Sequence, residues 1–251
     1  MTVRFCYENV ADEAELTASS ETSSLPASNV QDPRPTRVWR TSGAASESLV
    51  LDLGTARSVS MAALLEHNLT AEATVTLQAN SSDSWGSPPL EESLGWHSGL
   101  IVEFFEAAEY RYWRLVIADG GNADGYVQIG RVWLGGYFQP ARDFSKDFTV
   151  RRVDPSTVVY SDSGSKSVGE RTPYRVVELN FPSTEEKAEF EQVAETAGVG
   201  GDLIAALDPG NEVWSDGQHD YTLYCHLESA PDWSHRINDR WSLRLRLRET
   251  V

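Results

Sequence analysis

Alternating apolar and polar positions dominate the first half of the chain. Between residues 49 and 134, short runs place an apolar side chain at every second position, and turn residues separate the runs. In SLVLDLG, for example, Leu49, Leu51 and Leu53 share one side. This is the period of a half-buried strand. Short strands without long helices predict an antiparallel jelly-roll β-sandwich, and Gly130 in mid-strand suggests a β-bulge.

The second half combines strands with one helix. In PSTEEKAEFEQVAETAG, Ser183 and Glu186 have the spacing of a capping box, which satisfies free N–H groups at a helix start. Gly198 is a natural helix C-cap. The sequence therefore predicts one α-helix over residues 183–197. Its apolar face consists of Phe190, Val193 and Ala197.

The last predicted strand, RWSLRLRLRE, has two different faces. One face is apolar and the other carries four arginines. In a chain of net charge −17, such a face indicates a subunit interface, where guanidinium groups pair with carboxylates of a neighbouring copy. A solvated face is the alternative. The arginines are Arg240, Arg244, Arg246 and Arg248.

A change of pattern marks a domain boundary. The Gly-Gly pair at 135–136 and the following YFQPARDFSKDF are typical of a linker. We therefore expect a mainly β protein with a β-sandwich over residues 1–137, a linker over 138–146, and a second β-rich domain with the helix over 147–251.

Charge and cysteine content restrict the partners. A net charge of −17 repels phosphate backbones, so no nucleic-acid partner is expected. No apolar run has the length of a membrane span, and the N-terminus lacks the basic-then-apolar order of a signal peptide. The two cysteines, Cys6 and Cys225, form no disulfide framework or zinc cluster. Both are typical of buried small residues, and a single pairing between them stays open.

No motif predicts catalysis or a cofactor. Phosphate-loop, H-E-x-x-H and G-x-S-x-G patterns are absent, and no histidines have metal-ligand spacing on the expected helix. The acidic segment Asp119–Gly125 does not fit an EF-hand loop. A Gly/Asn turn is predicted there, and a cation in a different loop stays open.

Aromatic and planar polar side chains gather in the expected loops of the first domain. A sugar offers an apolar C–H face and a rim of hydroxyl groups, so such side chains are candidates for binding it. For the first of them, the alternative is a place in the core. The candidates are Trp39, Arg40, His67, Asn68, Trp85 and Trp96, with His97 beside the last.

The stretch from Ser28 to Asn68 resembles the start of a discoidin-type (coagulation-factor type C) β-sandwich. It contains SNVQDPRPTRVWRTSG, then LVLDLG and SVSMAALLEHN. The later pair YWRLVI and IGRVWLG is similar to the end of such domains, so the resemblance covers about residues 1–137. It implies a galactose-binding-like fold that binds sugars or other ligands with the loops at one end.

The second domain resembles the ring-forming domain of phage distal tail (baseplate) proteins. The resemblance covers about residues 145–251 and implies a β-sandwich with one helix that assembles into a ring. The chain departs from the usual pattern because its sugar-binding-type sandwich comes first. The resemblance depends on element order and on Arg175, Leu179, Phe181, Leu207, Asp208, Pro209, Tyr224 and Glu249.

Together these patterns favour a structural, non-enzymatic component of a phage tail tip. The expected partners are other copies of the chain in a ring of three or six, other tail proteins, and a cell-surface glycan. The expected location is the virion tail, after assembly in the host cytoplasm. A carbohydrate-active enzyme or its accessory binding module is the alternative, and would need paired carboxylates in the enzyme case. A third hypothesis is an architectural protein whose sandwich binds only protein.

Overall fold

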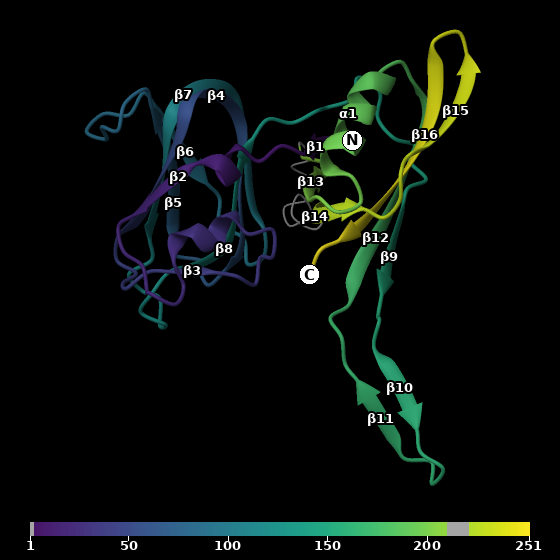
Figure 1. The fold of residues 1–251 in the computed structure, drawn as a ribbon, viewed down its shortest axis with the longest axis horizontal. Coiled ribbons are helices and arrows are strands. Elements are labelled where there is room, and N and C mark those ends of the chain that lie inside the picture. The colour runs from purple at the N-terminus through teal and green to yellow at the C-terminus, as the bar shows by residue number, and fades with distance from the viewer. Residues whose placement is uncertain (1–2, 210–220) are drawn as a thin grey trace. The chain divides into compact units, whose positions relative to one another are not determined.

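A computed structural model describes residues 3–209 and 221–251. The described chain is mainly antiparallel β-structure with a single α-helix, which confirms the predicted fold class. It divides into two compact units (Figure 1). The sandwich unit comprises Cys6–Phe138, and the C-terminal unit comprises mainly Gln139–Asn211 and Leu223–Val251, within the described ranges.

One sheet of seven strands forms the sandwich unit. Its order is β3-β8-β4-β7-β5-β6, and β2 pairs with β4. Two short 3-10 helices, η1 (Val10–Glu13) and η2 (Ala27–Gln31), accompany it. The strands are β2 (Glu15–Ala18), β3 (Trp39–Arg40), β4 (Glu47–His67), β5 (Thr74–Asn80), β6 (Leu90–Leu94), β7 (Ile101–Ala118) and β8 (Gln128–Gly135).

Two long strands turn this sheet into two layers. The β4–β7 ladder is interrupted between Asp52 and Arg57, where both strands arch over in Figure 1. On one side of the bend Leu49 points into the core, and on the other side Leu64 does. Both belong to one hydrophobic cluster, so the two halves of the strands face each other as the layers of a sandwich.

Gly130 on β8 has a different role from the predicted bulge. The β4–β8 register runs without a shift from Met61 to His67. A Cβ atom at Gly130 would lie 1.9 Å from the carbonyl oxygen of Pro35. The glycine therefore allows the Pro-rich loop to approach the strand closely.

The C-terminal unit contains a second seven-stranded sheet. Its order is β1-β13-β14-β16-β12-β9, with β15 paired to β16. Although the first strand was expected in the sandwich, β1 pairs with β13, because Phe5 packs among the aromatic rings of Phe181 and Phe190. The strands are β1 (Arg4–Cys6), β9 (Thr149–Val153), β12 (Tyr174–Thr184), β13 (Leu203–Ala206), β14 (Thr222–Leu227), β15 (Asp232–Ile237) and β16 (Arg240–Glu249).

The helix α1 spans Lys187–Ala197, so it begins later than predicted. Strand β12 continues through Thr184, and the hydroxyl of Thr184 accepts a hydrogen bond from the Glu186 N–H at 3.0 Å. The predicted capping box does not form, because Ser183 is still part of the strand. The C-cap prediction is confirmed: Gly198 has a φ of 54° and donates to the Ala194 carbonyl at 2.8 Å. The apolar face is also confirmed, since Phe190, Val193 and Ala197 are buried.

A two-stranded arm extends from this unit (Figure 1). It consists of β10 (Thr157–Tyr160) and β11 (Lys166–Gly169), which pair only with each other. Every residue of both strands is exposed. The two cysteines of the chain, Cys6 and Cys225, are both buried, and no disulfide joins them.

Candidate ligand-binding site

Strand register brings four loops to one end of the sandwich unit. Because β4 bends back on itself, its first residue and its last residue lie at the same end. Glu47 pairs with Ile117 at the end of β7, and His67 pairs with Ile129 at the start of β8. We call this the loop end. It carries residues 41–46, 68–73, 95–100 and 119–127.

Arg40 and Tyr126 form a stacked pair at the loop end. Arg40 lies opposite Gln128 in the β3–β8 register. Its guanidinium donates two hydrogen bonds to the side-chain oxygen of Gln128, at 2.7 and 3.2 Å. The guanidinium carbon lies 4.1 Å from the ring centre of Tyr126. Both side chains are half-buried, and the guanidinium has further N–H donors for a ligand.

Asn68 orders the segment that carries these partners. Its amide oxygen accepts from the Gln128 N–H at 2.7 Å. Its amide nitrogen donates to Asp124 at 2.9 Å and to the Tyr126 carbonyl at 3.0 Å. Because these bonds use both donors and the acceptor, Asn68 positions the loop and offers little to a ligand.

His67 lies beside this network, directly after a strained backbone position. The preceding residue, Glu66, has a φ of 51°, a left-handed conformation that is uncommon for a residue with a side chain. The Nδ1 atom of His67 accepts a hydrogen bond from the Leu69 N–H at 3.2 Å. Burial lowers the pKa of His67, although the backbone of His97 and Gly99 favours the charged form. The imidazole is therefore neutral near pH 7.

Trp96 provides an exposed aromatic surface at the same end. It keeps 37% of its surface exposed, while its indole N–H donates to the Leu69 carbonyl at 2.9 Å. That hydrogen bond holds the ring edge without covering its faces. The next residue, His97, accepts from the Gly99 N–H at 3.1 Å. An aromatic ring fixed by its edge is suited to stack on an apolar face of a ligand.

Asp119 closes the loop after β7. The buried carboxylate accepts from the Thr70 N–H at 2.9 Å, from the Thr70 hydroxyl at 2.5 Å and from Asn122 at 2.9 Å. Burial alone would raise the pKa of Asp119, but these hydrogen bonds outweigh it and lower the pKa. The carboxylate thus links loop 119–127 to loop 68–73 by hydrogen bonds. Within residues 3–209 and 221–251, no group of three or more His, Cys, Asp or Glu residues is arranged to hold a metal ion.

Two of the predicted ligand-binding residues lie elsewhere. Trp39 has no exposed surface and packs in the hydrophobic core, with its indole N–H donating to the Ser20 carbonyl at 3.1 Å. Trp85 lies in the loop between β5 and β6, at the end opposite the loop end. It is covered by the guanidinium of Arg114 at 4.6 Å. The loop end therefore brings together Arg40, His67, Asn68 and Trp96.

Three residues of this site were not among the predicted ligand-binding residues: Tyr126, Gln128 and Asp124. Tyr126 follows directly after the Gly125 turn, and an aromatic side chain just outside a turn was a usable signal. Gln128 and Asp124 gave no such signal, because their role depends on the strand register with Arg40 and Asn68.

The arginines of β16 have partners within the C-terminal unit. Arg240 pairs with Glu185 at 3.0 Å, and Arg244 and Arg246 pair with Glu178 at 3.3 and 3.5 Å. A further pair joins Arg246 to Glu228 at 3.4 Å. Arg248 stacks on Tyr174 at 4.0 Å. These contacts pair the arginine face within one copy. The subunit interface expected there stays a prediction.

Comparisons with known proteins find similar solved structures over about half of the chain. No family model matches the chain, and no curated protein matches it. Among solved structures, the chain is similar to chitosan-binding module 1 from a chitosanase/glucanase of Paenibacillus sp. IK-5. The identity is 20%, the match covers 51% of this chain and 99% of that module, and the TM-score is 0.42.

Two other similar structures come from different bacteria. One is the family 32 CBM of Clostridium perfringens NanJ in complex with galactose, with 20% identity, coverage of 53% and 99%, and a TM-score of 0.42. The other is a fucose-binding module of Streptococcus pneumoniae, with 13% identity, coverage of 51% and 95%, and a TM-score of 0.43. Likeness at this level assigns no ligand to this chain.

In the part of the chain that the structure describes, no helix is both long and apolar enough to cross a bilayer.

Proposed function

We propose that this protein is a non-enzymatic adhesion and assembly component of a phage tail tip or baseplate. In this proposal the loop end of the sandwich unit binds a cell-surface glycan, and the C-terminal unit assembles with other copies and with other tail proteins. The protein then belongs to the virion tail, after assembly in the host cytoplasm.

One observation carries the glycan-binding part: an edge-fixed, exposed indole and a stacked guanidinium lie at the same end of the sandwich. Trp96 offers an aromatic face, and Arg40 offers N–H donors fixed by Tyr126 and Gln128. A sugar presents complementary groups, an apolar C–H face and hydroxyl oxygens. Because internal hydrogen bonds already order Arg40 and Trp96, binding costs little conformational entropy.

A glycan array followed by titration calorimetry of the full chain tests this site. We expect Trp96→Ala and Arg40→Ala each to weaken binding of the best glycan at least about tenfold, as for a central aromatic or arginine contact. Trp85→Ala is the matched control, because Trp85 is another loop tryptophan of the same unit at the opposite end. It should bind as the wild type does.

Two results contradict the proposed site. One is that no glycan binds the wild-type chain. The other is that Trp85→Ala weakens binding as much as Trp96→Ala.

Support for the assembly part comes from the C-terminal unit. Its arm exposes valines and a tyrosine on two strands that pair only with each other. A two-stranded ribbon of this kind is marginally stable in water by itself. Coverage by another protein would stabilise it, which fits a component of a larger particle.

An accessory binding module of a carbohydrate-active enzyme is the second candidate. The observation in its favour is that the loop-end residues and their supporting contacts all lie in the sandwich unit, so glycan binding does not require a tail. Burial raises the pKa of Glu103 on β7, and the nearby Glu92 adds to this effect. If the chain is a carbohydrate-active enzyme, Glu103 is therefore the carboxyl group to test. Hydrolysis of a bound polysaccharide that Glu103→Gln abolishes would favour that form. Unchanged polysaccharide would exclude the enzyme form and would fit both the accessory module and the proposal above.

A further inference from the structure

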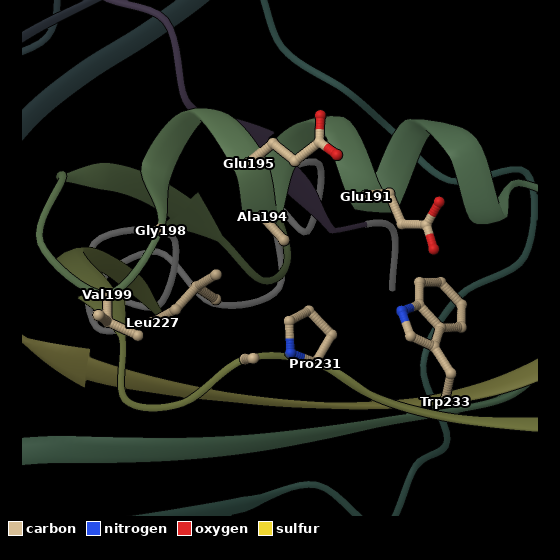
Figure 2. A pocket seen from close by; sticks show the side chains of 9 residues that line it. Glu191, Ala194, Glu195, Gly198, Val199, Leu227, Pro231 and Trp233 are labelled. Carbon is tan, nitrogen blue, oxygen red and sulfur yellow. The ribbon is translucent and has the colours of Figure 1, made fainter.

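The C-terminal unit has an apolar groove between α1 and the segment that leads into β15 (Figure 2). Its volume is about 250 Å³. In Figure 2, Pro231 and Trp233 face the helix across it. Two carboxylates, Glu191 and Glu195, lie along the helical side. The other lining residues are Ala194, Gly198, Val199, Leu227 and Ala230.

The size and lining of this groove suit a few side chains. Typical small-molecule pockets are larger, roughly 300–1,000 Å³, and place several polar groups toward the ligand. Here carbon atoms dominate the floor, and Val199 at the rim is 63% exposed. Exposed apolar surface beside acidic groups favours an apolar segment that carries a positive charge.

The arm of the same chain has these properties. In an antiparallel pair, residues opposite each other point to the same face. Val158 is opposite Val168, and Tyr160 is opposite Lys166, so these four side chains share one face, which we call the arm face. Val158, Val168 and Tyr160 are 45%, 42% and 66% exposed. The arm face therefore joins three uncovered apolar side chains to one ammonium group.

We propose that the arm face of one molecule docks in the α1 groove of a second copy of this chain. The valines and Tyr160 then cover the apolar floor, and Lys166 meets the carboxylates of Glu191 and Glu195. This inference rests on the assembly part of the proposed function and names the surfaces that carry it.

The arm does not serve its own groove. It projects from the C-terminal unit, away from α1, in Figure 1. The groove residue Leu227 lies level with Val177 on β12, because both pair with Leu247 on β16. Val168 on the arm comes nine residues before Val177, and nine residues of extended backbone span up to about 30 Å. Two different surfaces thus meet head to tail, and such a contact closes into a ring or continues as a filament.

Sedimentation velocity of the full chain at increasing concentration tests the contact. We expect the wild type to form oligomers. Val158→Asp, on the arm face, and Val199→Arg, at the groove rim, should each weaken association at least about tenfold. Both residues are exposed, so the substitutions should leave the fold intact, and circular dichroism checks this.

Val159→Asp is the matched control for the arm. Val159 is 59% exposed on the same strand, but it pairs with Ser167 on the opposite face of the arm. We expect this variant to associate as the wild type does. Equal effects of Val158→Asp and Val159→Asp would overturn the proposal, as would a wild type that stays monomeric at every concentration.

Mixing the two defective variants gives a stricter test. Val158→Asp keeps an intact groove, and Val199→Arg keeps an intact arm. The mixture should therefore form a dimer with one contact and nothing larger. Reappearance of the full wild-type oligomer, or no association at all, would contradict a head-to-tail contact.

Glycan binding separates this result from the proposed function. Each variant should keep the single-site affinity of the sandwich unit, because the substitutions lie in the other unit. Loss of oligomers with intact glycan binding supports the arm contact. Absence of glycan binding with intact oligomers contradicts the loop-end site and leaves the arm contact supported.

Discussion

The loop end of the sandwich unit and the arm of the C-terminal unit differ in how firmly their exposed side chains are held. At the loop end, Arg40, Asn68 and Trp96 are exposed or half-buried, yet each is fixed by hydrogen bonds within the chain. On the arm, Val158 and Tyr160 are exposed with only a second strand beside them. An ordered polar surface suits a small ligand, whereas an uncovered apolar surface suits contact with another protein.

The largest expected effect distinguishes two tryptophans of the sandwich unit, Trp39 and Trp96. Trp39→Ala should lower the free energy of unfolding by about 3–5 kcal/mol, because it leaves a cavity in the core. Trp96→Ala should cost less than about 1 kcal/mol, as for an exposed residue, while it weakens glycan binding. Urea unfolding with amide exchange detected by mass spectrometry measures both free energies. If Trp39→Ala were as stable as the wild type, the indole would not be part of the core.

An ion pair whose arginine is buried provides the next largest effect in the same unit. The side chain of Arg131 is 3% exposed and forms two hydrogen bonds to Asp12, at 2.5 and 2.8 Å, and one to the Val30 carbonyl. Arg131→Met should cost about 2–3 kcal/mol, because it removes donors from a carboxylate that is only partly exposed.

Arg34→Ala is the control for this pair. Arg34 also pairs with a carboxylate, that of Asp32, but its side chain is 63% exposed. We expect a much smaller cost than for Arg131→Met, because solvent screens an exposed ion pair. Similar unfolding free energies for the two variants would show that burial of Arg131 is unimportant.

A pH titration of stability tests the loop end. The pKa of His67 is lowered by burial, so the folded state resists protonation. Its contribution is complete above the ordinary histidine pKa of about 6.5 and is lost as the pH falls below it. The slope from this group stays below about 1.4 kcal/mol per pH unit.

His67→Gln is the variant for this titration. Glutamine can still accept a hydrogen bond from the Leu69 N–H but carries no titrating group, so the slope between pH 6.5 and 5, roughly the histidine range, should flatten. The lowered pKa values of Asp52 and Asp119 act only below about pH 4. An unchanged slope in His67→Gln would mean that the imidazole is not buried in the folded state.

The smallest effect is expected on the arginine face of β16. Arg244 is an exposed partner of Glu178, so Arg244→Ala should change the free energy of unfolding by less than about 0.5 kcal/mol. Sedimentation should show the same oligomers as the wild type. Dissociation of the oligomers by this variant would restore the arginine face as an assembly surface and weaken the case for the arm.

The strands were predictable because their burial follows a period of two. In β16, for example, Leu243, Leu245 and Leu247 are buried as their spacing indicates. The helix start was not predictable from Ser183 and Glu186, because the strand before it extends to Thr184. The spacing of residues within a short segment does not show where a strand ends and the following helix begins.

The candidate site was predictable only in part, for a related reason. Trp39 and Trp96 both lie near turns, and both were candidates for ligand binding. Only the packing of distant strands buries one and exposes the other. In the same way, Glu178 and Glu228 neutralise β16 arginines from positions far along the chain. These pairings depend on sheet order, which no local pattern contains.

The bend shared by β4 and β7 has a mechanical consequence. Each strand contributes to both layers of the sandwich, so neither layer can peel away while the other stays whole. A load that pulls on β4 or β7 is therefore shared between the two layers. In the proposed role between a particle and a surface, this sharing would help the unit to resist force.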